Sequence, residues 1–375
     1  MGLNEILVDL IKFPVGQKNV LSIYLDLRPD RSGKKLYPVY LKNQLSEIKK
    51  NFPPRAKEQV DLGHDIKLVY KFLDEELNPA WKGLAIYACS AVNLFVPLPM
   101  LQPPPNYISY APFPHLFLLL LQTPLYQPHA VIVATSRQAS LNLVRSGYLA
   151  KQLNFSWEDK HTTRFGRMGW SLPKFQRHLQ EHLKQRSKEI VENLEKLIIP
   201  EKFEYLFVVA EEGIAGELQK QMPAALKKKW ISLPNSDIHD PLPKILASAT
   251  ETLLNLFRSE AENLANYILA EAEPMGRAAS GPERILSALP DHQIERMVLD
   301  KEFAASGWRC VKCFSLGFGG LPKACPYCAG SICATNLREE IVLKAKSQNI
   351  EILFTEKFPP LLKAGGVAAL FKYKK

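Results

Sequence analysis

The chain has 375 residues, of which 46% are hydrophobic and 23% are charged, and its formal net charge is +10. This composition excludes an intrinsically disordered chain, because it supplies enough apolar residues for a buried core. The length allows two or three domains at roughly 150 residues each. The positive charge is compatible with a polyanionic partner, although charge alone does not name one.

The sequence carries no pattern typical of secretion or membrane anchoring. The N-terminal residues lack a cationic segment and a cleavage pattern, and Ile6 stands where a myristoylation signal needs Ser or Thr. The weakly charged run at residues 83–102 contains prolines and alternates like paired strands, so it predicts sheet. Four of the six cysteines form CxxC pairs, which favours a metal site in a reducing compartment. We therefore expect a cytoplasmic protein with no membrane partner.

The first part of the chain predicts an α/β domain. Residues 18–27 and 83–96 are rich in β-branched and aromatic side chains and predict strands, whereas residues 39–77 show helical spacing. Residues 97–114 contain seven prolines and predict an irregular connection, because proline cannot donate a hydrogen bond to a central strand. A short apolar helix that starts at His115 then closes the domain.

A second alternating pattern begins at His129 and predicts the start of another domain. The sequence HAVIVA, a turn and the sequence SLNLV predict a β-hairpin. A loop rich in cations and glycines follows, and apolar residues at helical spacing from Leu172 to Leu197 predict a helix with Ser171 as its N-cap. Residues 205–210 predict a buried strand, and residues 242–270 predict a long helix.

The last part of the chain predicts a small α/β/α sandwich. From Gly281 onward the pattern is helix, strand, cysteine-rich insert, helix, strand and strand. The fold class is therefore α/β, with three α/β domains and one inserted module. The predicted bounds are residues 1–127 for the N-terminal domain, 128–258 for the middle domain, 259–375 for the C-terminal domain and 307–333 for the insert.

Four cysteines of the insert form the pattern CxxC-x11-CxxC: Cys310, Cys313, Cys325 and Cys328. Each CxxC loop can present two thiolates to one ion, and a structural zinc takes four such ligands in a tetrahedron. Two redox-active CxxC pairs are the alternative interpretation. Because four thiolates leave no open coordination position, we expect a structural zinc in a zinc ribbon.

Residues 160–188 form a strongly basic stretch. They include eight Lys or Arg residues and one acid, Glu181, which gives a local charge of +7. Gly169 and Trp170 lie in the same stretch, so a loop here can approach phosphates while an aromatic ring stacks on a base. A solvated helix face is the alternative, and charge alone favours it.

These pieces, in this order, resemble the archaeal and eukaryotic class-one peptide chain release factors and Pelota, and most closely their bacterial relatives. In the middle domain of that family, a hairpin leads to a Lys-His pair, a Gly-Gly-Gln-Ser loop and a basic helix with Arg-Phe. The matching positions here are Lys160 and His161 for the pair, residues 168–171 for the loop, and Lys174, Phe175 and Arg177 for the helix. The closing sequence GGVAALFKY also resembles the last strand of the family.

The resemblance implies a fold and a set of partners. The N-terminal α/β domain would contact the decoding region, and a ribonuclease-H-like middle domain would reach the peptidyl-transferase centre. The C-terminal domain would be an L30-like sandwich that meets a translational GTPase. The partners at the loop would be ribosomal RNA and the acceptor end of a tRNA. The implied RNA-binding residues are Lys160, His161, Arg164, Arg167, Lys174 and Arg177.

The loop departs from the family pattern at its catalytic positions. Met168 replaces the first glycine, and Trp170 stands where the family has the glutamine that positions water. Gly169 and the backbone amide of Trp170 could still stabilise an oxyanion, so these two residues are the catalytic candidates. The first domain also lacks the Asn-Ile-Lys-Ser element of stop-codon reading. We therefore expect a ribosome-binding factor that acts on stalled or idle ribosomes without codon-specific termination.

Two alternatives stay open at this point. One is a peptidyl-tRNA hydrolase that releases nascent chains in ribosome rescue, which cleavage of the ester by the purified protein would reveal. The other is a zinc-ribbon protein of another RNA, which would bind free RNA without a preference for ribosomes. Rescue, recycling and hibernation are all compatible with the sequence.

Overall fold

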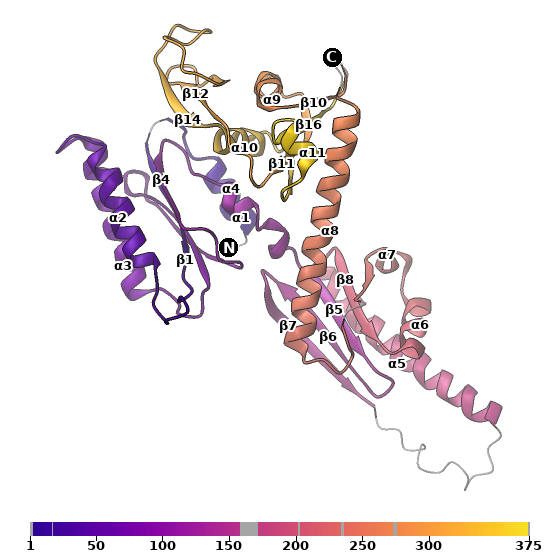
Figure 1. The fold of residues 1–375 in the computed structure, drawn as a ribbon. Helices are drawn as coiled ribbons and strands as arrows, with labels where there is room; N and C mark the ends of the chain where they lie inside the picture. Colours follow the sequence, from indigo (N-terminus) through magenta and orange to yellow (C-terminus); the bar gives the residue numbers. More distant parts are fainter. Residues whose placement is uncertain are drawn as a thin grey trace. The chain divides into compact units, whose positions relative to one another are not determined.

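The computed structural model describes residues 3–16, 18–157, 172–201, 203–233, 236–272 and 276–373. The chain divides into two compact units (Figure 1). We call Met1–Thr123 together with Leu256–Lys375 the composite unit, and Pro124–Asn255 the middle unit. The three-domain division expected from the sequence stays a prediction, but the composite unit contains segments assigned to both its first and its last domain.

An antiparallel sheet with the strand order β3-β2-β1-β4 forms the N-terminal part of the composite unit. Its strands are β1 (Val20–Asp26), β2 (Gly83–Cys89), β3 (Leu94–Met100) and β4 (Tyr107–Ala111). β1 and β2 are buried along almost their whole length, and successive side chains of a strand point to opposite faces. Leu21 and Ile23 therefore pack into one core cluster, whereas Tyr24 packs into another.

Two layers of helix supply the residues that complete these clusters. The helices are α1 (Leu3–Ile11), α2 (Tyr37–Lys50), α3 (Lys57–Glu75) and α4 (Phe117–Leu120), with the short 3-10 turns η1 (Ser90–Val92) and η2 (Thr123–Tyr126). Leu41 of α2 and Leu62 of α3 are fully buried with the Leu21 face of the sheet. Leu10 of α1 and Phe117 of α4 are buried with the Tyr24 face.

The prediction of an irregular connection at residues 97–114 is wrong in part. Pro97 and Pro99 lie in β3, where they pair with Ile86 and Leu84 of β2, and β4 occupies residues 107–111. Both strands lie at edges of the sheet. An edge strand tolerates proline because one of its sides needs no hydrogen-bond donors.

The C-terminal part of the composite unit is a second sheet with the order β10-β16-β11-β15. Its elements are β10 (Ala278–Ser280), α9 (Pro282–Ala288), β11 (Ile294–Asp300), α10 (Leu337–Ser347), β15 (Glu351–Thr355), α11 (Pro359–Lys363) and β16 (Val367–Phe371). Met297 of β11 faces a core that includes α9 and α10, and the next residue, Val298, faces a core that includes α11 and the last turns of α8 (Leu242–Ala270). This is the expected α/β/α layering, and the mixed α/β class is confirmed.

One hydrophobic core is shared by the two parts of the composite unit. The cluster that contains Tyr24 and Phe117 also contains Met297 and residues of α10. At its centre, the backbone N–H of Phe117 donates to Glu339 Oε2 at 3.1 Å, and the Arg338 guanidinium lies 4.0 Å from the centroid of the Phe117 ring. Glu339 is 2% exposed, so the first turn of α10 buries a carboxyl group against α4.

The cysteine-rich insert forms its own small sheet between β11 and α10. Its strands are β12 (Ser306–Cys310), β13 (Leu316–Phe318) and β14 (Ile332–Asn336), in the order β13-β12-β14 and antiparallel. Gly307 of β12 packs tightly there, because a Cβ at this position would lie 2.2 Å from the carbonyl oxygen of Gly317.

The middle unit is a five-stranded mixed sheet with the order β7-β6-β5-β8-β9. Its elements are β5 (His129–Ala134), β6 (Gln138–Arg145), β7 (Tyr148–Ser156), α5 (Leu172–Glu201), β8 (Tyr205–Ala210), α6 (Glu212–Gln221), α7 (Ala224–Lys227) and β9 (Trp230–Ser232). β8 runs parallel to both β5 and β9, and α5 and α6 pack into the same core cluster as these strands. The predicted hairpin is therefore extended on one side by β7 and on the other by β8.

The sequence pattern does not predict β7. Most of its side chains are exposed on both faces of the strand, so the alternation of apolar and polar residues that marks a half-buried strand is absent. β7 is held in the extended conformation by its pairing with β6. That pairing has a register shift between Leu143 and Val144.

Candidate metal centre and basic helix

Two CxxC loops of the insert have the same backbone construction. In the first, the N–H of Phe314 donates to Cys310 O at 3.1 Å, and the N–H of Cys310 donates to Ser315 O at 2.9 Å. In the second, the N–H of Ala329 donates to Cys325 O, and the N–H of Cys325 donates to Gly330 O, both at 2.9 Å. We call these loops the first and second knuckles.

Each knuckle ends on a residue in the left-handed region of backbone conformation. The φ angle is 57° at Phe314 and 55° at Ala329, each directly after the second cysteine of its knuckle. Such a φ is uncommon outside glycine and carries a conformational cost. The same turn at both positions brings two pairs of cysteines to one point.

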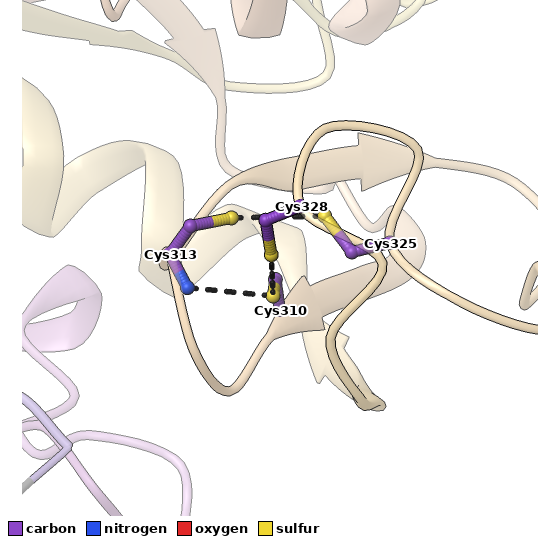
Figure 2. A group of neighbouring side chains, drawn as sticks. All are labelled: Cys310, Cys313, Cys325 and Cys328. Carbon is purple, nitrogen blue, oxygen red and sulfur yellow. Dashed lines mark hydrogen bonds between the residues drawn. The ribbon is translucent and has the colours of Figure 1, made fainter.

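The four thiol groups form a compact cluster (Figure 2). Their sulfur atoms all lie within 4.8 Å of one another. The short contacts cross between the knuckles: Cys310 Sγ lies 3.4 Å from Cys328 Sγ, and Cys313 Sγ lies 3.6 Å from Cys325 Sγ. Four zinc–sulfur bonds of about 2.3 Å in a tetrahedron place the sulfurs roughly 3.8 Å apart, so these cysteines fit one tetrahedral ion.

Backbone donors favour the thiolate form of Cys310, because they lower its pKa. The backbone N–H groups of Lys312 and Cys313 donate to Cys310 Sγ at 3.3 and 3.4 Å. A Cβ on Gly330 would lie 3.2 Å from Cys328 Sγ and 3.3 Å from Cys310 Sγ. Glycine at this position therefore lets the second knuckle approach the first.

The clustered thiols perturb one another's pKa values. Hydrogen bonding to the Ser315 hydroxyl lowers the pKa of Cys313 to about 6. The backbone N–H of Gly330 lowers the pKa of Cys328, but the neighbouring thiols outweigh it and raise that pKa to about 12. Four thiolates cannot share this space by themselves, and a divalent ion would remove the repulsion.

Arg309 anchors the first knuckle to the rest of the composite unit. Its guanidinium lies 5.4 Å from the centroid of the Phe113 ring and 6.0 Å from that of Phe314. Its Nε lies 3.5 Å from Glu340 Oε1, and these two side chains are 8% and 7% exposed. The sequence pattern does not identify Arg309 or Glu340 as buried residues, because a charged residue in a strand and one in the first turn of a helix normally face water.

The release-factor-like loop lies outside the described residues. This applies to Lys160, His161, Arg164, Arg167, Gly169 and Trp170. Lys174 and Arg177 lie in α5, and the side chain of Arg177 is exposed. The structure therefore describes the two elements that flank this segment in the sequence, which are β7 before it and α5 after it.

One cation of the basic stretch has a structural role. Arg186 of α5 is 5% exposed, its guanidinium lies 5.6 Å from the centroid of the Trp157 indole, and it donates to the carbonyl oxygen of Ser136. Lys184 and Lys188 on the same helix are exposed. The local charge of +7 therefore overstates what the stretch offers to a partner.

Comparisons with known proteins found one matching family model and several matching solved structures. Residues 114–253 match the family model described as bacterial archaeo-eukaryotic release factor family 10. Among solved structures, the archaeal translation termination factor aRF1 is 14% identical, with 99% of this chain and 97% of that chain covered and a TM-score of 0.25. Dom34 of S. cerevisiae is 12% identical, with 78% and 81% covered and a TM-score of 0.40. The C-terminal domain of a peptide chain release factor from Methanosarcina mazei is 20% identical, with 38% and 98% covered and a TM-score of 0.28.

No curated protein matches the chain. Over the part of the chain that the structure describes, no helix combines the length and the apolar character needed to cross a bilayer. The family match spans β5 to β9, which is where the sequence predicted the release-factor hairpin and the basic helix. Over residues 114–253, the chain is therefore similar to the bacterial archaeo-eukaryotic release factors of family 10.

Proposed function

We propose that this protein is a ribosome-binding factor that acts on stalled or idle ribosomes in the cytoplasm, without codon-specific termination. The observation that carries the proposal is the family match at residues 114–253, which includes the whole basic stretch at 160–188. In this proposal the loop predicted from the sequence at residues 168–171 meets ribosomal RNA and the acceptor end of a tRNA. A translational GTPase is the further partner that the resemblance implies.

The described part of the basic stretch supports an RNA partner. Arg177, Lys184 and Lys188 are exposed along α5, directly after the loop. Cations of this kind contact phosphates, and each contact adds to the salt dependence of binding. Arg186 is excluded from this role by its burial against Trp157.

Binding without hydrolysis is the version of the function that the loop sequence favours. Trp170 replaces the glutamine of the family, and an indole has a donor but no carbonyl oxygen with which to orient water. Its flat ring can instead stack on a base. A hydrolase that uses the backbone amide of Trp170 beside Gly169 is the second candidate, because an amide donor can stabilise a developing oxyanion.

We further propose that the four-cysteine cluster holds zinc and that the ion is structural. Zinc suits four thiolates in a tetrahedral set, and this set leaves no position for water or substrate. The ion would stabilise the folded ribbon. Arg309, which packs against Phe314 and Phe113, connects the first knuckle to the rest of the composite unit.

Co-sedimentation with purified ribosomes tests the proposal. The full-length protein should pellet with ribosomes at low salt and dissociate progressively as the salt concentration rises. A parallel reaction with labelled peptidyl-tRNA on the ribosome should show no release above background. Absence from the ribosomal pellet at every salt concentration would contradict the proposal, and binding with rapid release would favour the hydrolase.

A further inference from the structure

A hollow of about 550 Å³ opens on the middle unit at α6, α7 and β9. It is lined by Gly216, Gln219 and Lys220 of α6, Lys227 of α7 and Trp230 of β9. Its volume lies within the range of roughly 300–1,000 Å³ that is typical of small-ligand sites. None of its residues belongs to the metal centre or to the basic stretch at 160–188.

Trp230 gives the hollow a fixed aromatic wall. The indole is half-buried and packs against the core cluster of the middle unit, and its Nε1–H donates to Ser232 Oγ at 3.0 Å. β9 is the outermost strand of its sheet. Since the polar edge of the ring already has a partner, the part of the ring that lines the hollow offers an apolar surface for stacking.

Lysines give the hollow a positive rim. Lys220 and Lys227 line it, and the exposed Lys228 follows Lys227 in the sequence. Lys220 Nζ lies 2.5 Å from Glu217 Oε1, whereas Lys227 makes no ion pair with any residue that the structure describes. An aromatic wall with such a rim suits a ligand that combines a flat ring with a phosphate.

Gly216 keeps the hollow open. A Cβ at this position would meet no atom within 4 Å. Glycine inside a helix costs roughly 1 kcal/mol relative to alanine, and neither packing nor a positive φ requires it here. A larger side chain at this position can therefore fill the space without disturbing the core.

We propose that this hollow binds one unstacked nucleotide of a single-stranded RNA, with the base stacked on Trp230 and the phosphates beside Lys220 and Lys227. None of the residues that line the hollow belongs to the segment 158–171. The proposal does not depend on ribosome binding, because its test uses a free oligonucleotide. A free mononucleotide has the same chemistry, and the test distinguishes the two sources.

The test measures binding of a fluorescein-labelled single-stranded RNA of about ten nucleotides to the full-length protein by fluorescence anisotropy. Gly216→Leu should weaken binding at least fivefold by filling the hollow, and its melting temperature should hold or rise, because leucine favours helix over glycine. Trp230→Ala should weaken binding by roughly five- to 150-fold, and Trp230→Phe should restore part of the loss.

The lysines are tested through the salt dependence of the same binding. Lys220→Gln with Lys227→Gln should reduce the slope of log affinity against log salt by about 1.4, which corresponds to two phosphate contacts with a single strand. Lys67→Gln with Lys71→Gln is the matched control, since it removes two exposed lysines from α3 and should leave the slope unchanged. Unchanged RNA binding in a folded Gly216→Leu protein would overturn the proposal. Binding of AMP as tightly as the oligonucleotide would overturn the assignment to RNA.

Discussion

The ring of Phe314 occupies the space into which a side chain on Gly16 would extend: a Cβ built on Gly16 would lie 2.6 Å from Phe314 Cε1. Both residues have a positive φ, 57° for Phe314 and 84° for Gly16. Phe314 directly follows Cys313 of the first knuckle. The four-cysteine cluster is thus joined, through one aromatic ring, to the segment that follows α1.

This contact predicts that alanine destabilises the protein more at Gly16 than at Gly33. Gly16→Ala should destabilise the protein by about 1–2 kcal/mol through backbone strain and by about 1–3 kcal/mol more through the clash with Phe314. Gly33→Ala is the matched control, because Gly33 has a φ of 82° but no atom within 4 Å of its Cβ position. Urea unfolding of the two variants measures the difference. Equal losses of stability would show that Phe314 does not press on Gly16.

Loss of one of the four cysteines should increase hydrogen exchange outside the zinc ribbon as well as within it. Cys325→Ser should lose zinc, and hydrogen exchange should then increase both in residues 306–336 and around Phe13 and Gly16, because the ion holds the first knuckle in place. Cys333→Ser is the control, since Cys333 lies outside the four-cysteine cluster. Elemental analysis and hydrogen exchange provide the two measurements. Full zinc content in Cys325→Ser, or exchange confined to the ribbon, would contradict this prediction.

Glu339 predicts a dependence of stability on pH. Burial raises its pKa from 4.5 to about 7, although the N–H of Phe117 and the charge of Arg338 oppose the rise. The folded state therefore holds a proton that the unfolded state releases, and this contribution to stability is present below pH 4.5 and lost as the pH rises through 7. The total is about 3 kcal/mol.

Replacing the carboxyl by an amide tests this dependence. Glu339→Gln should match the wild type in melting temperature at pH 4.5 and exceed it by several degrees at pH 8, because glutamine cannot ionise and its amide oxygen can still accept from Phe117. The comparison at each pH cancels the other titrating groups. A variant that is less stable than the wild type at pH 8 would show that the ionised carboxylate stabilises the α4–α10 contact.

Some cations of the basic stretch should contact RNA, whereas Arg186 should only stabilise the fold. Arg164→Ala with Arg167→Ala should lower the slope of log ribosome affinity against log salt by about 1.4–1.8 if each arginine meets one phosphate. Arg186→Gln removes a cation from the same stretch, but it should lower the melting temperature without changing that slope, because Arg186 packs on Trp157. Ribosome sedimentation across a salt series gives both slopes, and identical slopes for the wild type and the double variant would remove the loop from the interface.

Local patterns predicted the order of most elements and the clustering of Cys310, Cys313, Cys325 and Cys328. The helix at residues 242–270 was placed at the bounds it has in the structure. Tertiary context decided the rest: Pro97 and Pro99 sit in a strand because that strand is at an edge, and β7 exists through its pairing with β6. Arg309 and Glu340 are buried because the ribbon folds back onto α10, a contact that no local pattern encodes.

The most direct test of the central claim uses ribosomes that carry a labelled nascent peptidyl-tRNA, with and without a stop codon in the decoding site. The wild-type protein is added, and the fraction bound to the ribosome and the fraction of peptide released are measured in the same reaction. We expect stable binding to both complexes, with peptide release no faster than the rate without the protein. Rapid release of the peptide at either codon would contradict this expectation and would identify the protein as a peptidyl-tRNA hydrolase.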